Sequence, residues 1–580
     1  MKFLKKSAAA LLCGLAAGIA VTLAASMACA DVPRGQVLGE LMLVLDLPLK
    51  SGRSFIDVDE TTPYGQALDS ALSLGILYPA DDFSPEIICT NAETLMFALQ
   101  AMGFRHEGEI ARWALPPEDS KLPQYISGYV ALAKSMKPSA PADVTASPWG
   151  NTTEDQLRRV LRWAAQCRQS VLWEHEIKRP EGTLKIHRES VGRPPRAWRV
   201  MLGIYESEER AAAAAQRASG TYQFTVVPID WSWAAVSQPV ADRAVAWKMA
   251  AAVGAGNFSA AIIPESGESE ALFWAAFTPK NNADAVIRGS RTVAAWKLRR
   301  LSDMAQRHGA LAAVNGGYFS GSGPIGTLFS DGLPMTGPYY NRSMAAWDNR
   351  GRLCFTGGEY RARLQINDSD PITVSLNALG GPGQTAVLTP AMGKSKRRAG
   401  NNGTVALVHD GLVQEVTRAL AYRRDMGEGD WLIVTRDPKV NIKKGDRAKL
   451  QTQWRNEPPF PVGTAVQAGP LIYAPRHRYW DEMIDENVLS LRHPRTLLGQ
   501  KGRQMVWIVV DGRSSWHSRG LTIEEAAALG RRLGLTALLN LDGGGSSELW
   551  WDGHIVNRVS DGRERPMPYG LMVLKKETAK

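Results

Sequence analysis

The chain has 580 residues, which is too long for one hydrophobic core and implies roughly three or four domains. Hydrophobic residues make up 44% of it and charged residues 22%, so the composition excludes a largely disordered protein. The formal net charge is +10, but no dense Lys/Arg run interleaved with aromatic residues points to nucleic acid as a partner.

Residues 1–30 have the pattern of a secretory signal peptide. Lys2, Lys5 and Lys6 precede an Ala-rich apolar stretch, and Ala28-Cys29-Ala30 supplies a small-residue cleavage site. Cys29 is alternatively a lipidation site. Cleavage leaves 65 basic and 58 acidic residues, a net charge of +7, which suits an anionic wall polymer as partner. We therefore expect a secreted protein of the cell envelope or cell wall, with no membrane span in the mature chain.

Residues 40–178 are expected to be helical. Residues 64–77 have helical apolar spacing, and Thr90-Asn-Ala-Glu93 opens an amphipathic helix that ends at Gly103. A second, weaker copy of this helix-loop-helix pattern follows, and its second helix begins at Thr152-Thr-Glu154. The pattern resembles S-layer homology units, the second one degenerate, and this resemblance implies binding to a wall polymer. The family usually has Arg where Asn91 stands, and a plain helical domain is the alternative.

Residues 196–265 alternate strand and helix patterns in the order βαββαβ, which is typical of a ferredoxin-like module. The strand at Trp198 to Ile204 followed by an Ala-rich helix resembles the SPOR domain. That resemblance implies a peptidoglycan ligand, and an adaptor without a ligand is the alternative.

Residues 268–577 are expected to form a mixed α/β catalytic domain, so the whole chain is a multidomain α+β protein. A helix is predicted from Thr292 to His308. It leads into a short apolar strand that ends in Asn315-Gly316-Gly317. Glycine there lets the backbone approach a ligand, and the Asn315 amide can both donate and accept hydrogen bonds.

Two aspartates follow apolar strands further along. The run Val506 to Val510 precedes Asp511-Gly-Arg513, and the run Ala537 to Asn540 precedes Asp542. A helix capped at Thr522 joins the runs, so we expect two parallel strands with both carboxylates at one sheet edge. Ligands bind at such an edge in α/β sheets, although two ordinary Gly-rich turns are the alternative.

The combination of motifs in this region resembles the phosphodiester glycosidase family. Six motifs occur in its order: Asn315-Gly-Gly-Tyr-Phe319, Pro324-Ile-Gly326, His493-Pro-Arg495-Thr496, Asp511-Gly-Arg513, Asn540-Leu-Asp542-Gly-Gly-Gly-Ser-Ser547, and Asn557 to Pro566. The best-known activity of that family removes N-acetylglucosamine from a glycosyl phosphodiester. The resemblance therefore implies an enzyme that hydrolyses a sugar-1-phosphodiester in a wall or surface glycan.

The residue types suit this chemistry. Arginines grip phosphate oxygens through paired hydrogen bonds, which makes Arg495, Arg513 and Arg565 phosphate-binding candidates. Asp511 or Asp542 would act on water or as nucleophile, while the other orients an Arg or a sugar hydroxyl, and the sequence leaves these roles undivided. The remaining candidates are Asn315 as a catalytic residue, and a backbone and hydroxyl anion cradle made by Gly316, Gly543, Gly544, Gly545, Ser546 and Ser547. Glu548 is a reserve acid, and His493 is expected to be structural or to position substrate.

Two other function classes stay open. A metal-assisted phosphodiesterase would use the carboxylates as metal ligands. Asp and Asn side chains could hold Ca²⁺ or Mg²⁺, although no EF-hand loop or His-Glu metal motif is present and the glycosidase chemistry requires no cofactor. A non-catalytic protein that binds wall glycan is the third reading.

Overall fold

The computed structural model describes residues 30–576 apart from gaps, the longest of which are 48–54, 117–121, 192–196, 255–259, 265–270, 379–383, 393–402 and 419–425. The predicted signal peptide lies, except for Ala30, outside the described residues. The chain divides into two compact units, one of residues 1–173 and 189–196 and one of residues 174–188 and 197–580. Within the described residues, no helix is both long and apolar enough to cross a membrane.

The first unit is helical, as predicted. Its helices are α2 (Arg34–Val44), α3 (Gly65–Ser73), α4 (Asn91–Ala101), α5 (Arg105–Ala114), α6 (Gln124–Ser135), α7 (Ala142–Ala146) and α8 (Glu154–Gln169). Thr90 and Glu93 form the predicted capping box, and Thr153 caps α8 in the same way with Gln156. Helix α4 was expected to be amphipathic, but every residue of it is buried, so it is the central helix of this unit.

The helical region differs from its predicted bounds of 40–178. It begins at Arg34 and ends at Gln169, and a strand hairpin that the sequence reading missed follows directly. The hairpin consists of β1 (Ser170–Arg179) and β2 (Gly182–Val191), which lie at one end of an eight-stranded sheet. Both strands carry many charged residues, and this masked their strand pattern.

Residues 198–264 have the predicted βαββαβ order. The elements are β3 (Trp198–Tyr205), α9 (Glu208–Ala218), β4 (Phe224–Ile229), β5 (Ser232–Ser237), α10 (Arg243–Gly254) and β6 (Ala261–Pro264). Their sheet has the order β4-β5-β3-β6, the arrangement of a ferredoxin-like module. The SPOR and S-layer assignments themselves stay predictions.

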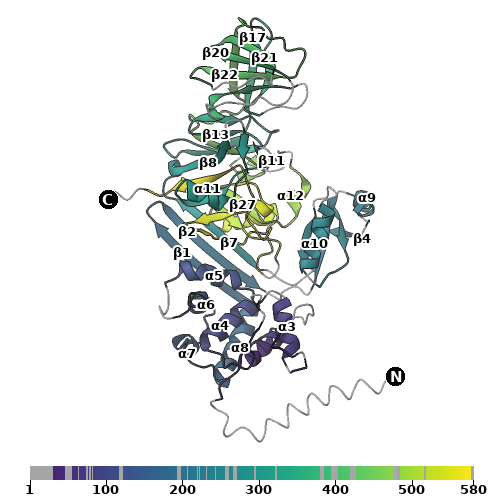
Figure 1. Ribbon diagram of the computed structural model, residues 1–580, viewed down its shortest axis with the longest axis vertical. Coiled ribbons are helices and arrows are strands. Elements are labelled where there is room, and N and C mark those ends of the chain that lie inside the picture. Colours follow the sequence, from purple (N-terminus) through teal and green to yellow (C-terminus); the bar gives the residue numbers. More distant parts are fainter. Residues whose placement is uncertain are drawn as a thin grey trace. The chain divides into compact units, whose positions relative to one another are not determined.

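The rest of the second unit is rich in strands, in agreement with an α+β chain (Figure 1). The eight-stranded sheet has the order β1-β2-β7-β28-β27-β29-β25-β26, with β7 (Leu272–Pro279), β28 (Gln504–Val510), β27 (Arg495–Lys501), β29 (Ala537–Asn540), β25 (Leu471–Ala474) and β26 (His477–Arg478). A six-stranded sheet has the order β31-β30-β10-β32-β8-β9, with β31 (His554–Ile555), β30 (Leu549–Trp551), β10 (Ala310–Asn315), β32 (Tyr569–Leu574), β8 (Ala285–Thr292) and β9 (Ala295–Lys297). These two sheets supply the strand ends discussed below.

The predicted strand-helix-strand unit is present with one correction. Helix α13 (Ile523–Arg532) joins β28 to β29 and opens with the predicted Thr522 and Glu525 capping box. The two strands are not neighbours, because β27 lies between them and is antiparallel to both. Strands β28 and β29 therefore still run in the same direction, and the residues that follow them reach the same sheet edge. The start of β27 reaches that edge too, since Arg495 pairs with Val510.

The predicted helix from Thr292 to His308 is wrong in its first half. Strand β9 occupies Ala295–Lys297, and helix α11 spans only Leu301–Arg307. Two arginines precede this helix, and its Leu301, Met304 and Ala305 are buried against the six-stranded sheet. Within residues 292–308, the apolar residues therefore follow a helical spacing only from Leu301 onward.

Two further sheets lie between β10 and β27 in the sequence. A five-stranded sheet has the order β14-β13-β24-β15-β16, with β14 (Leu333–Thr336), β13 (Leu328–Ser330), β24 (Thr464–Gln467), β15 (Ser343–Trp347) and β16 (Leu353–Gly357). A seven-stranded sheet has the order β21-β20-β22-β19-β18-β17-β23, with β21 (Leu412–Arg418), β20 (Thr404–His409), β22 (Asp430–Thr435), β19 (Thr385–Leu388), β18 (Ile372–Leu376), β17 (Tyr360–Ile366) and β23 (Ala448–Trp454). The seven strands curl until Leu412 bridges Arg447, and they enclose a separate apolar core (Figure 1).

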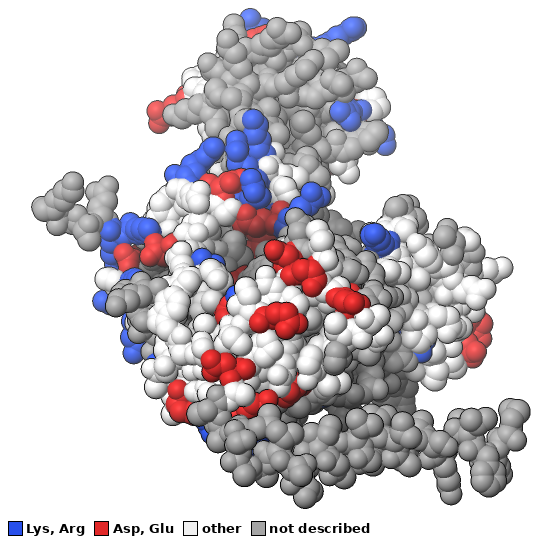
Figure 2. Space-filling view, turned by 60° about the horizontal axis from the view of Figure 1, so that its bottom comes forward, with Lys and Arg blue, Asp and Glu red and all other residues white. Residues whose placement is uncertain are grey.

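Charge on the described surface has both signs. On the face drawn in Figure 2, basic and acidic side chains lie among many uncharged ones. The excess of basic residues thus does not turn this face into a uniformly basic surface.

Candidate active site

The site candidates gather where β10, β27, β28 and β29 begin or end. Asp511 directly follows β28, Asp542 lies two residues after β29, and Asn315 is the last residue of β10. The Asp542 N–H donates to the carbonyl of Gly316 at 3.2 Å, so the loops after β10 and β29 lie against each other. Both predicted aspartate loops and the Asn-Gly-Gly turn therefore belong to one region of the second unit.

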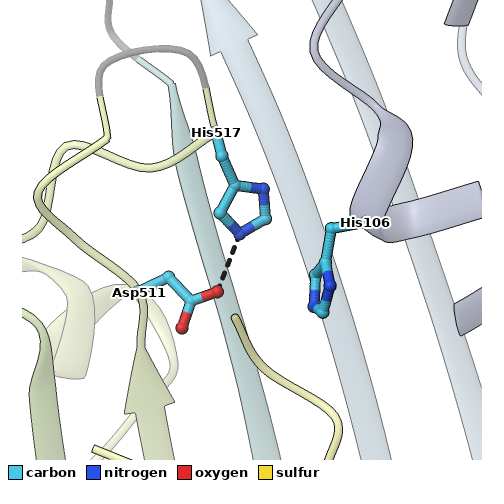
Figure 3. A group of neighbouring side chains, drawn as sticks. All are labelled: His106, Asp511 and His517. Carbon is cyan, nitrogen blue, oxygen red and sulfur yellow. Dashed lines mark hydrogen bonds and ion pairs between the residues drawn. The ribbon is translucent and has the colours of Figure 1, made fainter. Parts of the chain in front are cut away.

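Asp511 is buried, at 1% exposure, and its carboxylate is fully engaged. One oxygen accepts from the Asn557 side-chain amide at 2.8 Å. The other faces His517 Nε2 at 2.7 Å (Figure 3) and accepts from the Arg558 N–H at 2.7 Å. The third residue drawn in Figure 3, His106, belongs to the N-terminal unit. A carboxylate held by three donors orients its neighbours, and this geometry favours a positioning role for Asp511.

Asn315 is also fully engaged, which favours a structural role over the predicted catalytic one. Its amide nitrogen donates to the Asp542 carbonyl at 2.8 Å and to the Gly316 carbonyl at 3.2 Å. Its amide oxygen accepts from the Thr496 hydroxyl at 2.7 Å and from the Glu548 N–H at 3.2 Å. The side chain fastens β10 to the Asp542 loop and has no bonding capacity left for substrate.

The glycine after Asn315 is required by close packing. A Cβ on Gly316 would lie 2.2 Å from the ring of Tyr569, whose hydroxyl accepts from the Gly317 N–H. Gly316 therefore permits a tight backbone approach within the protein, and its predicted role as an amide donor to phosphate gains no support from its contacts.

Asp542 is the carboxylate of this group that is only partly buried. Its Oδ1 accepts from the Gly543 N–H at 3.0 Å, and the Ser546 hydroxyl also hydrogen-bonds to it. Burial raises the pKa of Asp542 to about 6, although Ser546, Arg565 and the Gly543 N–H each act to lower it. A carboxyl group with such a pKa exchanges protons near neutral pH, which suits a general base or nucleophile.

The predicted amide cradle is largely closed. Gly543 donates to Asp542, Gly544 donates to the Pro494 carbonyl at 2.9 Å, and Ser546 and Ser547 donate within the 3₁₀ turn that spans Gly544–Ser546. Four of the five amides from Gly543 to Ser547 are therefore used by the protein itself. The hydroxyl of Ser547 is buried and has no hydrogen-bond partner in the described structure.

Two arginines lie over this glycine turn. A Cβ on Gly544 would lie 3.0 Å from Arg513 Nη2, and one on Gly545 would lie 2.3 Å from Arg565 Nη2. Arg565 Nη1 donates to the Ser546 hydroxyl at 3.3 Å. The glycines are thus needed so that the guanidinium groups can approach the backbone beside Asp542.

Asp561 links the two arginines. Its carboxylate accepts from Arg565 Nη2 at 2.6 Å and lies 3.6 Å from Arg513 Nη1. One carboxylate shared by two guanidinium groups leaves an excess of positive charge, and burial lowers the pKa of Arg513. Arg513 and Arg565 together therefore suit an anionic ligand group such as phosphate.

Arg495 is not placed to bind phosphate in this way. It is 2% exposed, and its guanidinium donates to the carbonyls of Val488, Leu491 and Leu521 at 2.6–2.9 Å. These bonds fasten α12 (Glu486–Ser490) to the segment before α13. These contacts favour a structural role for Arg495 over the predicted phosphate-binding one, because a buried guanidinium satisfies nearby carbonyls first.

Glu548 is fully buried at the end of the same loop. Its Oε1 accepts from the Arg565 N–H at 2.8 Å, while Oε2 has no hydrogen-bond partner in the described structure. Burial, followed by the charges of Glu564 and Asp561, raises the pKa of Glu548 to about 8. The raised pKa favours the protonated form of Glu548, whose Oε1 supports the backbone of Arg565.

The contacts of His493 favour a structural role, which stays a prediction beside the alternative of positioning substrate. Its Nε2 faces the Asn487 carbonyl at 3.2 Å, and burial lowers the pKa of His493 to about 3. A ring with so low a pKa binds a proton only weakly, which disfavours a general-base role for His493.

Sequence reasoning missed His517, Asn557 and Asp561 as members of the site. Asn557 and Asp561 lie inside the motif Asn557 to Pro566, and this position could have identified them as candidates. His517 lies six residues after Asp511 with no motif of its own, and only the fold places it against that carboxylate.

A divalent ion would compete with these contacts. Both oxygens of Asp511 and Oδ1 of Asp542 already accept hydrogen bonds from N–H groups. A metal would have to displace these donors, so the donor set favours chemistry without Ca²⁺ or Mg²⁺, which stays a prediction.

Comparison with known proteins connects this region to a family. Residues 402–574 match the phosphodiester glycosidase family. The phosphodiester glycosidase match contains Asp511, Arg513, Asp542, Asp561 and Arg565, but it starts well after Asn315. It is shorter than the predicted domain of residues 268–577. The structure adds β10 to the matched region through the bonds of Asn315.

Individual relatives are more distant. A stretch of 78 residues is 41% identical to the SPbeta prophage-derived uncharacterized protein YomE of Bacillus subtilis, and this match spans 13% of the present chain and 12% of that protein. A putative exported protein of Burkholderia pseudomallei shares the fold with a TM-score of 0.54 at 19% identity, covering 70% of this chain and 96% of the other. The zebrafish N-acetylglucosamine-1-phosphodiester alpha-N-acetylglucosaminidase catalytic domain aligns over 54% of this chain and 80% of the other with a TM-score of 0.29 and 13% identity, too low to bear on the fold.

Proposed function

We propose that this protein hydrolyses a glycosyl-1-phosphodiester bond, of the type found in N-acetylglucosamine-1-phosphodiesters. The observation that carries the proposal is the half-buried Asp542 beside Arg513 and Arg565, inside the region that matches the phosphodiester glycosidase family. This arrangement offers a carboxylate for the sugar carbon and cations for the phosphate next to it.

The proposed reaction breaks the bond between the anomeric carbon and the phosphate oxygen. The electron pair leaves with that oxygen, and the oxygen of water forms the new bond to the anomeric carbon, directly or after a sugar–Asp542 ester. The proton of water passes to Asp542 when the attack is direct. Positive charge that develops on the sugar is stabilised by the same carboxylate.

The leaving group needs little help from an acid. A phosphate monoester is already stable as an anion, so Arg513 and Arg565 suffice to neutralise its charge as the bond breaks. Asp511 does not contact substrate in this mechanism. It holds His517, Asn557 and the backbone of Arg558, and thereby fixes the segment that carries Asp561 and Arg565.

We place the protein in the cell envelope, outside the cytoplasm. The predicted signal peptide supports this location, and the structural neighbour from Burkholderia, which is described as a putative exported protein, agrees with it. The predicted wall-polymer and peptidoglycan binding of the N-terminal modules would hold the enzyme near a wall or surface glycan.

The test uses the full-length protein and an N-acetylglucosamine-1-phosphodiester in water enriched in ¹⁸O. We expect the label in the product sugar and none in the phosphate. We also expect Asp542→Asn to lower kcat by about 100-fold or more, because it removes the reacting carboxylate. Asp552→Asn is the matched control, since Asp552 also precedes a glycine in the turn between β30 and β31.

Label in the phosphate would contradict the proposal and favour attack at phosphorus. Retained activity of Asp542→Asn would remove Asp542 from the mechanism. Absence of turnover with tight binding would favour a protein that only recognises glycan.

A further inference from the structure

A cluster of tyrosine and arginine side chains lies beside the Asp542 loop. The guanidinium carbon of Arg342 lies 4.8 Å from the ring centre of Tyr318 and 5.2 Å from that of Tyr339. Tyr339 in turn packs edge-to-face on Tyr340, with 4.5 Å between ring centres. We call Tyr318, Tyr339, Tyr340 and Arg342 the tyrosine–arginine platform.

Buried polar side chains hold the backbone of the platform in place through hydrogen bonds. Gln467, at the end of β24, accepts from the Tyr339 N–H at 2.9 Å and donates to the Arg342 carbonyl at 2.7 Å. Glu482 accepts from the Ser343 N–H at 2.9 Å and from the Leu471 N–H at 2.7 Å. The segment that carries Tyr339 and Arg342 is thus fixed at both ends before any ligand binds.

Tyr318 connects the platform to the proposed reaction centre. Its hydroxyl donates to the Gly469 carbonyl at 2.7 Å and accepts from the Asn540 side chain at 3.2 Å. Asn540 lies two residues before Asp542. Burial, followed by the charge of Asp542, raises the pKa of Tyr318 to about 12.

The platform has binding capacity that the fold does not use. Tyr339 is 39% exposed and Tyr340 is 61% exposed. Among the described residues, Arg342 forms no ion pair with a carboxylate, and its buried Nε has no hydrogen-bond partner. Exposed tyrosine faces stack on sugar rings, and an unneutralised guanidinium attracts phosphate.

We propose that the tyrosine–arginine platform is a second subsite, which binds a further sugar-phosphate unit of the substrate next to the unit being cleaved. The substrate class is then a polymer of repeating glycosyl phosphates rather than a single capped diester. This inference rests on the proposed function. It extends the substrate from a single glycosyl-phosphodiester bond to the glycan polymer that contains this bond.

The test compares a fragment with one glycosyl-phosphate repeat and a fragment with two. Their Kd values are measured by calorimetry on the full-length Asp542→Asn protein, so that no turnover interferes. We expect the two-repeat fragment to bind about tenfold tighter. Arg342→Gln and Tyr339→Ala should each remove most of that difference.

The chain offers a matched control for Arg342. Arg531 stacks on Tyr473 at 5.4 Å from the ring centre and lies outside the platform. Arg531→Gln should keep the preference for two repeats. Equal binding of both fragments, or a preference that survives Arg342→Gln, would overturn the subsite. Absence of hydrolysis by the parent protein, with the binding preference intact, would instead reject the proposed function alone.

Discussion

At the scale of single residues, the two aspartates have different surroundings although their sequence contexts are alike. Each follows an apolar strand and precedes a glycine. The sequence could therefore name both but not divide their roles, because the donors on Asp511 come from segments up to 47 residues away. The same holds for Arg495 and Arg513, of which only Arg513 lies against the glycine turn.

Glu548 makes stability depend on pH in a specific direction. Its pKa is raised from 4.5 in the ordinary state to about 8 in the folded protein. The folded state thus favours the protonated acid, and the stabilising contribution of the proton is complete below about 4.5 and is lost as the pH rises through 8.

We expect Glu548→Gln to remove this dependence, because glutamine stays neutral. The melting temperature of the variant minus that of the parent should increase between pH 5 and pH 9, measured by thermal unfolding at a series of pH values. A difference that is constant across this range would show that Glu548 is already ionised in the folded protein.

At the scale of elements, the glycine turn after β29 sets the distance between backbone and guanidinium groups. A Cβ on Gly545 would lie 1.9 Å from the Asp561 carboxylate and 2.3 Å from Arg565. Both side chains would have to move away from Asp542, and overpacking of this kind typically costs roughly 1–3 kcal/mol.

Gly545→Ala should therefore lower kcat/KM for the phosphodiester by about tenfold or more, with the larger part of the loss in substrate affinity. Gly220→Ala is the control, since its Cβ would meet open space. Unchanged kinetics of Gly545→Ala would mean that the Asp561–Arg565 pair does not contribute to phosphate binding.

The strength of local patterns decided which elements could be predicted. Capping boxes at Thr90 and Thr522 and the apolar run of β28 are signals within a few residues, and the structure confirms them. The predicted shared edge is present, but strand β27, which lies between β28 and β29, went unnoticed. Pairing between strands depends on partners far apart in sequence, which local pattern does not contain.

At the scale of the whole molecule, we propose that the reaction uses hydrogen-bonded side chains and requires no bound ion. Both oxygens of Asp511 and Oδ1 of Asp542 already accept hydrogen bonds from N–H groups. We expect hydrolysis to persist after dialysis against a strong chelator, with kcat within about twofold of the untreated protein. Loss of activity that Ca²⁺ or Mg²⁺ restores would contradict this expectation.

The bond between the Asn315 amide and the Asp542 carbonyl joins residues that are 227 positions apart. Strands β27, β28 and β29, by contrast, come from one continuous stretch and can pair early during folding, when loop closure is cheap in entropy. The Asn315 bond closes a much longer loop, so we expect it to form later. A nascent or partly folded chain would therefore lack the ordered Asp542 loop, and catalytic competence would report on completion of the native structure.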